Sequence, residues 1–272
     1  MSTTTIADDD KTPRCAGCTN SESPLLTCSA CKLVKYCSVG CQKKHHPQHK
    51  EQCLKRAVEL YYEGHDNNAL FKPPPPQEDC PICSVPMPHD AEQKAYQPCC
   101  GQMWCGGCGV AASSLAPSAF TCPFCRNEGP SSVESFVGML NKLVDSKEGN
   151  GMACFILAGF YKERKIELYT RGAELGCTDA MYALGLCYDE GTGVKKNRNK
   201  AIQLWEQAAM AGSSNARLCL GAIEDMRKNK ERAIKHWMIA AMAGDDKALL
   251  CIEKNYDKNH VTQKDFNLAR RV

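Results

Sequence analysis

The chain has no long hydrophobic run, and only 7% of its residues are aromatic. No stretch approaches eighteen apolar residues, so we expect no membrane-spanning helix and no membrane partner. Residues 1–11 are polar and acidic, which predicts no secretory signal and an intracellular protein, in the cytoplasm, the nucleus or both. No segment has the pattern of a phosphate loop, a Ser-His-Asp triad or paired catalytic carboxylates, so we expect no catalytic residues of its own.

Proline is absent from residues 151–272, although the whole chain has 14 prolines. That half is instead rich in Ala, Leu, Lys and Glu, which favour helices. Cysteine is just as uneven, because fifteen of the 20 cysteines precede residue 126. At 272 residues the chain has room for two or three small domains, and we expect a cysteine-built half followed by a helical half.

The dense cysteines are either a disulfide scaffold or metal ligands. Disulfides need an oxidising compartment, which the polar N-terminus argues against. Most of these cysteines form Cys-x-x-Cys pairs, and a tight turn lets both sulfurs of such a pair lie about 2.3 Å from one zinc ion. We therefore favour zinc.

The first cysteine block supplies eight possible ligands. They are Cys15, Cys18, Cys28, Cys31, Cys37, Cys41, His49 and Cys53. Their types and spacings resemble the MYND zinc finger, in which alternate ligand pairs share an ion. The resemblance implies one zinc on the pairs that begin at Cys15 and Cys37, and a second on the pairs that begin at Cys28 and His49. Metal binding then supplies most of the folding free energy, since the finger is too small for its own apolar core.

Three histidines compete for the one imidazole ligand. His45 and His46 are near neighbours of His49, but only His49 lies four residues before a cysteine, on a predicted short helix. We therefore expect His49 to bind zinc.

MYND fingers bind proteins, often through proline-containing peptides. The resemblance places the contact groove at Tyr36, Gln42 and His46, where the family usually has tryptophan at the position of His46. An alternative is that the finger packs against its own chain, with Pro73–Pro76 as an internal ligand. Nucleic acid is not an expected partner, because lysines near the finger offset the charge of zinc-bound thiolates and the net charge is only +3.

A second cysteine block follows a proline-containing linker. Its cysteines are Cys80, Cys83, Cys99, Cys100, Cys105, Cys108, Cys122 and Cys125. The block resembles a RING finger, which implies one ion on the pairs that begin at Cys80 and Cys105. The second ion would use Cys122 and Cys125 with ligands from the segment Cys99–Gln102. Gln102 stands where a RING commonly has histidine, so Cys99 and Cys100 are the alternative ligands.

RING fingers recruit a ubiquitin-conjugating enzyme and have no nucleophile of their own. The family's contact needs an aliphatic residue in the first zinc loop, a proline in the last pair and an arginine after it. Ile82, Pro123 and Arg126 occupy these positions. Each could also be structural, as finger core, turn former or solvated charge.

The helical half repeats itself. The pattern Ala201, Trp205 and Gly212 recurs 32 residues later as Ala233, Trp237 and Gly244, and resembles Sel-one-like repeats, relatives of tetratricopeptide repeats. The resemblance implies a solenoid of helix pairs that serves as an adaptor, with two good units at residues 180–212 and 216–244. The remaining cysteines have no ligand spacing, and we interpret them as small core residues. They are Cys154, Cys177, Cys187, Cys219 and Cys251.

The expected fold class is a multidomain chain with two zinc-stabilised cross-brace fingers, MYND and RING-like, and an all-α helical-repeat solenoid. The predicted segments are a disordered N-terminus (1–13), the MYND finger (14–55), a linker (56–78), the RING-like finger (79–127), a linker or short helix (128–150) and the repeats (151–272). We expect four structural zinc ions. Two functions remain open: an adaptor that acts as a RING-type ubiquitin ligase, or a non-enzymatic scaffold.

Overall fold

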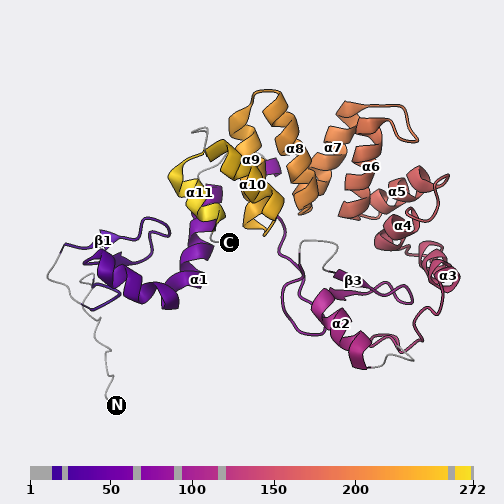
Figure 1. Ribbon diagram of the computed structural model, residues 1–272, viewed down its shortest axis with the longest axis horizontal. Coiled ribbons are helices and arrows are strands. Elements are labelled where there is room, and N and C mark those ends of the chain that lie inside the picture. Colours follow the sequence, from indigo (N-terminus) through magenta and orange to yellow (C-terminus); the bar gives the residue numbers. More distant parts are fainter. Residues whose placement is uncertain are drawn as a thin grey trace, which may run out of the picture. The chain divides into compact units, whose positions relative to one another are not determined.

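The computed structural model describes residues 14–19, 24–63, 69–88, 94–115, 121–256 and 261–270 (Figure 1). The predicted disordered segment 1–13 lies outside these residues. The chain divides into two compact units, residues 1–66 with 263–272 and residues 67–262. Within the described ranges, no helix combines the length and the apolar character needed to cross a membrane.

The first unit is a small finger followed by a long helix. Strands β1 (Leu26–Thr27) and β2 (Lys35–Tyr36) pair antiparallel, and helix α1 spans Val39–Glu63. The Ser38 hydroxyl caps α1 by accepting a 3.2 Å hydrogen bond from the Cys41 amide. The buried centre of the finger consists mainly of cysteine side chains, so it lacks an apolar core of useful size.

The C-terminal helix α11 (Gln263–Ala269) contacts α1 within this first unit. The sequence placed residues 263–272 with the repeats, and it ended the finger at residue 55. In the structure α1 continues to Glu63, and α11 buries Leu268 and Ala269. Burial of these two apolar side chains explains why the last helix groups with α1.

The second unit begins with the 3₁₀ turn η1 (Ala69–Phe71) and a second finger. Strands β3 (Lys94–Tyr96) and β4 (Met103–Cys105) pair antiparallel and lead into helix α2 (Gly106–Leu115). Trp104 is 1% exposed, and its ring centroid lies 5.1 Å from that of Phe124. This aromatic pair joins the hairpin to the last cysteine turn.

Eight helices then follow one another along the chain, most of them as antiparallel pairs (Figure 1). They are α3 (Val133–Val144), α4 (Gly151–Leu157), α5 (Lys165–Glu174), α6 (Thr178–Glu190), α7 (Arg198–Met210), α8 (Ser214–Met226), α9 (Lys230–Met242) and α10 (Asp246–Tyr256). Each helix packs against the next, as expected for a solenoid.

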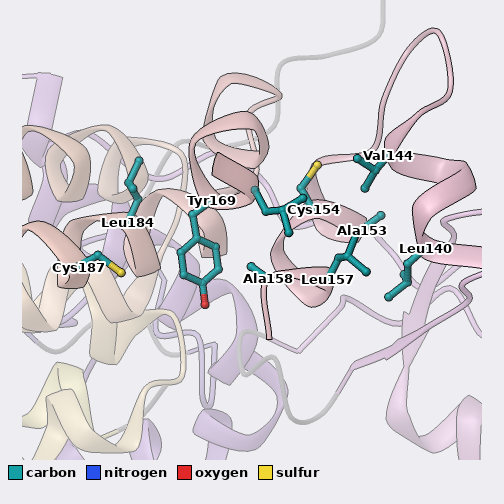
Figure 2. Packing of buried hydrophobic residues seen from close by; sticks show 10 residues of the cluster. Leu140, Val144, Ala153, Cys154, Leu157, Ala158, Tyr169, Leu184 and Cys187 are labelled. Carbon is teal, nitrogen blue, oxygen red and sulfur yellow. The ribbon is translucent and has the colours of Figure 1, made fainter. Parts of the chain in front are cut away.

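A continuous apolar core joins the first helices of the solenoid (Figure 2). Leu140 and Val144 of α3 are fully buried beside Leu157 of α4, and the core continues to Leu184 of α6. The segment that the sequence assigned to a linker or short helix therefore supplies a capping helix of the solenoid.

Two glycines allow tryptophans to pack closely against neighbouring helices. A Cβ atom at Gly185 would lie 2.3 Å from Nε1 of Trp205, and a Cβ at Gly221 would lie 2.3 Å from Nε1 of Trp237. Since real contacts are never this short, both positions require glycine. The tryptophans are therefore packing residues of the repeat.

The second finger is attached to the solenoid by a hydrogen-bond relay. The Tyr96 hydroxyl donates to Oδ1 of Asn150 at 3.0 Å, and the same oxygen accepts from the Ala153 amide at 2.8 Å. Asn150 is the N-cap of α4, so the finger's hairpin contacts the beginning of a solenoid helix.

Candidate metal centres

Zinc geometry sets a distance against which each cluster can be judged. Four sulfurs that lie about 2.3 Å from one tetrahedral ion are separated from one another by about 3.8 Å. In each of four clusters in the described residues, the ligand sulfurs all lie within 4.8 Å of one another. The donor sets and their spacing therefore fit four structural zinc ions.

The first centre brings together Cys15, Cys18, Cys37 and Cys41. The Sγ of Cys37 lies 3.5 Å from that of Cys18 and 3.6 Å from that of Cys41. Cys15 and Cys18 lie on a tight turn, whereas Cys41 lies on the first turn of α1. Ligands from three separate elements thus converge, and an ion here would hold the finger's ends together.

The second centre groups Cys28, Cys31 and Cys53, with His49 beside them. The Sγ atoms of Cys28 and Cys53 are 3.8 Å apart, and Nε2 of His49 lies 3.2 Å from Sγ of Cys31. His49 is 3% exposed, and burial lowers its pKa, which favours the neutral imidazole that binds zinc. His49 therefore lies where a fourth ligand for this centre would be needed.

The competing histidines have other contacts. Nδ1 of His45 lies 3.0 Å from the Tyr36 hydroxyl, and its ring stacks on His49 at a centroid distance of 5.6 Å. His46 instead lines a cavity of about 510 Å³ between the finger, α1 and α11. His45 therefore packs between Tyr36 and His49, and His46 faces the cavity.

The third centre contains Cys80, Cys83, Cys105 and Cys108. Its sulfur separations are 3.9 Å for Cys80 and Cys108 and 3.8 Å for Cys83 and Cys105. Two ligands come from the turn at residues 80–83, one ends β4 and one lies on the first turn of α2. The pairing of the first with the third cysteine pair is the cross-brace arrangement that the resemblance implied.

The fourth centre groups the adjacent cysteines Cys99 and Cys100 with Cys122 and Cys125. Sγ of Cys99 lies 3.4 Å from that of Cys125, and Sγ of Cys100 lies 3.7 Å from that of Cys122. Gly101 follows with a φ of 75°, a left-handed value that turns the chain sharply after two consecutive ligands. Gln102 is exposed, and the four cysteines by themselves supply four ligands.

Backbone amides favour the thiolate form of the first cysteine in each finger, which is the form that binds metal. The Cys37 amide donates to Sγ of Cys15 at 3.3 Å and lowers the pKa of Cys15 to about 6. Burial alone would raise the pKa of Cys80, but backbone donors led by Cys105 outweigh it and lower that pKa to about 6. A thiolate is the form that binds zinc, and a bound cation would deprotonate the remaining thiols as well.

The residues expected to contact partners lie in different environments. Ile82 is 46% exposed, and Pro123 and Arg126 are also exposed. Tyr36 is buried in the finger, and Gln42 is half-buried with its amide 3.8 Å from Sγ of Cys28. The second finger therefore presents its expected contact residues to solvent, whereas the first uses two of its own internally.

The cysteines of the helical half form no metal cluster among the described residues. Cys154 and Cys187 are buried in the solenoid core, whereas Cys177, Cys219 and Cys251 are half-buried. Burial raises the pKa of all five thiols, so they are held in the neutral form of small core residues.

The repeats contain two buried polar residues that the sequence pattern did not predict as functional. Arg217 is 2% exposed and His236 is 1% exposed, although both lie on solenoid helices. Arg217 donates to the Leu70 carbonyl, and His236 contacts the Phe71 ring. The only signal in the sequence is that they replace apolar residues of neighbouring repeats.

Two protein families match parts of the chain. Residues 15–53 match the MYND finger, and residues 178–213 and 217–245 match the Sel1 repeat. The chain therefore contains a MYND finger and an all-helical Sel1-repeat solenoid, as its residues predicted. Both are protein-interaction modules, and together with the four clusters they define a zinc-binding interaction adaptor.

The curated relatives share the first finger. The chain is 46% identical over 39 residues to human histone-lysine N-methyltransferase SMYD3, a match that covers 14% of this chain and 9% of that protein. It is 45% identical over 42 residues to SET domain and MYND-type zinc finger protein 6 of Schizosaccharomyces pombe, covering 15% of this chain and 9% of that protein. The similarity thus spans less than a tenth of either relative.

Two solved structures are similar to the solenoid. A Sel1 repeat protein from Oxalobacter formigenes is 22% identical, with a TM-score of 0.42 over 49% of this chain and 60% of that one. The protein c5321, a protective antigen of uropathogenic Escherichia coli with an SLR fold, is 24% identical, with a TM-score of 0.40 over 51% of this chain and 32% of that one.

Proposed function

We propose that this adaptor recruits a ubiquitin-conjugating enzyme through its second finger and acts as a RING-type ubiquitin ligase. Such a ligase needs no nucleophile, because it only holds the loaded conjugating enzyme beside a substrate. The MYND finger and the solenoid would select that substrate. Its compartment would be the cytoplasm or the nucleus, where the 20 cysteines remain reduced.

The observation that carries the proposal is the position of Ile82, Pro123 and Arg126. Ile82 lies inside the Cys80–Cys83 turn and Pro123 inside the Cys122–Cys125 turn, where the neighbouring thiols face a metal centre. Both side chains are exposed, as a docking surface for a conjugating enzyme requires. Exposed aliphatic residues held by two rigid metal centres favour binding, because little conformational entropy is lost on association.

Arg126 follows directly after the last ligand. Its φ is 60°, and its amide donates to the Cys122 carbonyl at 2.8 Å. The left-handed conformation closes the zinc turn and leaves the guanidinium in solvent. An arginine there is free to donate hydrogen bonds to the carbonyl oxygens of a bound ubiquitin.

A scaffold without ligase activity is the second candidate. It is favoured by the contact of Tyr96 with Asn150, which attaches the second finger to the first helices of the solenoid. If the chain is a scaffold, the finger caps and stabilises the repeats, and its exposed residues do not bind a ubiquitin-conjugating enzyme.

An in vitro ubiquitination assay with a panel of conjugating enzymes separates the two functions. We expect polyubiquitin chains with the wild-type chain and a loss of at least about ten-fold with Ile82→Ala, since truncating a central interface residue costs more than about 1.4 kcal/mol. Val133→Ala is the control, because Val133 is also an exposed aliphatic residue but lies outside the finger. Wild type and Ile82→Ala that are equally inert across the panel would establish the scaffold instead.

A further inference from the structure

A short apolar segment of the second unit packs against the repeats. Leu70 and Phe71 of η1 are 7% and 5% exposed, and η1 contacts both α7 and α9. The segment continues as an extended run in which Pro74 and Pro75 lie within 3.9 Å of the position that a Cβ of Gly212 would occupy. Two apolar anchors followed by prolines thus lie on the repeats as a bound peptide would.

Cationic and imidazole groups of α9 surround the Phe71 ring. The His236 ring centroid lies 4.9 Å away, Cζ of Arg232 lies 5.1 Å away and Nζ of Lys235 lies 5.7 Å away. The electron-rich face of an aromatic ring attracts such cations, whereas an aliphatic side chain gains nothing from them. This pocket therefore selects an aromatic residue.

Arg217 recognises the backbone of the same segment. Its Nη1 donates to the Leu70 carbonyl at 2.7 Å, and its Nη2 donates to the Ala209 carbonyl at 3.1 Å. The guanidinium is almost fully buried, so it must be satisfied by such acceptors. A contact with a main-chain carbonyl fixes the direction of a peptide whatever its side chains are.

These polar residues interrupt the repeat pattern only where the segment binds. The position of Arg217 is occupied by Met181 in the preceding unit and by Leu249 in the following one. The position of His236 corresponds to Leu204, which packs against the solenoid core. Burying Arg and His in place of apolar residues costs free energy unless a ligand compensates, so this unit is specialised for binding.

We propose that the surface of α7–α9 around Arg217 and His236 is a peptide-binding site, and that Leu70–Pro75 is its tethered, displaceable occupant. The partner that fits is an extended segment of another protein with an aliphatic–aromatic pair followed by prolines. Such a partner would release Leu70–Pro75 from the repeats when it binds. This proposal does not depend on ligase activity.

The first experiment vacates the site in the full chain. A Leu70→Ser/Phe71→Ser variant, called the vacated chain, should no longer place its own segment in the site. It is titrated with a fluorescent peptide that spans residues 67–77, and binding is followed by anisotropy. We expect the vacated chain to bind at least about ten-fold tighter than wild type, because a short tether holds the internal copy at an effective concentration on the order of 1 mM. A peptide with alanine in place of Phe71 should bind neither chain.

Variants that restore the repeat pattern are the matched controls. In the vacated chain, Arg217→Met and His236→Leu introduce the residues that neighbouring units carry, so the solenoid should stay folded while peptide binding is lost. Equal affinity of the peptide for these variants and for the vacated parent would overturn the proposal. A folded vacated chain that binds the peptide no better than the alanine peptide would overturn it as well.

A second measurement uses the wild-type chain and needs no variant. Amide hydrogen exchange of residues 69–72, which precede the prolines, is followed as the concentration of free peptide is raised well above the tether's effective concentration. We expect exchange in this segment to accelerate as its internal copy is displaced. Unchanged exchange at saturating peptide would show that the segment is a permanent part of the solenoid, and the proposal would fail.

Discussion

The guanidinium of Arg217 donates a 2.7 Å hydrogen bond to the main-chain carbonyl of Leu70, 147 residues earlier in the chain. The bond joins the segment before the second finger to the middle of the solenoid. Because Arg217 is buried, the stability of the repeats depends on a segment that sequence reasoning had placed in a linker.

Truncating Phe71, the aromatic residue buried against the repeats, should destabilise the helical half. We expect Phe71→Ala to lower the free energy of unfolding by about 3 kcal/mol, since a buried phenylalanine is replaced by a cavity. The measurement is urea-induced loss of helical circular dichroism. Phe160→Ala is the control, because Phe160 is 46% exposed, and it should change stability far less. Equal effects of the two substitutions would mean that Phe71 is not anchored.

His236 should make the solenoid sensitive to acid. Burial, with Arg217 and Arg232 nearby, lowers the pKa of His236 to about 3, whereas an exposed histidine titrates near 6.5. Between these values the unfolded chain binds the extra proton, so stability is full above about pH 6.5 and falls as the pH drops toward 3.

The matched variant for this effect is His236→Leu, which copies the apolar residue of the preceding repeat. We expect wild type to lose about 3 kcal/mol more than His236→Leu between pH 6.5 and pH 4. Comparing the two chains cancels the acid sensitivity of the zinc centres, which both share. Parallel stability curves for the two chains would show that His236 is not buried as a neutral group.

Zinc content should distinguish the ligands of the fourth centre. We expect four ions in the wild-type chain, three in Cys100→Ser and four in Gln102→Ala, because Cys100 is one of four clustered cysteines that complete the centre without the exposed Gln102. Metal analysis of the purified chains measures this. A loss of zinc in Gln102→Ala would reassign the ligand. Chelation of all ions should unfold both fingers, since neither has a large apolar core.

Adding a methyl group at two helical glycines should have opposite effects. Gly185→Ala should cost about 1–3 kcal/mol, because the new Cβ would overlap the Trp205 ring. At Gly138 nothing lies within 4 Å, so Gly138→Ala should stabilise α3 by about 0.5–1 kcal/mol. Urea unfolding of both variants tests the pair, and a neutral Gly185→Ala would contradict the close helix contact.

Local spacing predicted most of the metal chemistry. Each Cys-x-x-Cys turn is formed by residues adjacent in sequence, so the turn geometry needs no tertiary information. The repeat pattern in turn predicted helices that bury Trp205 and Trp237. The family matches confirm the MYND finger and the Sel1 repeats. The ligase function of the second finger stays a prediction.

Long-range contacts could not be predicted from the ligand spacing or from the repeat pattern. Whether Cys99 or Gln102 completes the fourth centre depends on how the backbone turns at Gly101, and the contact of α1 with α11 joins segments that are far apart in the sequence. Neither is encoded in ligand spacing. The role of a buried arginine in a repeat likewise cannot be predicted until its hydrogen-bond acceptor is known.

The sequence by itself determined the zinc-binding turns and the helical repeat, because both arise from residues a few positions apart whose side chains meet within one turn or one helix pair. Only the tertiary structure decided that Leu70 and Phe71 pack on the solenoid. Their burial and the hydrogen bond from Arg217 exist only once the repeats have stacked, since stacking alone creates a site that is deep enough to exclude water from a charged group.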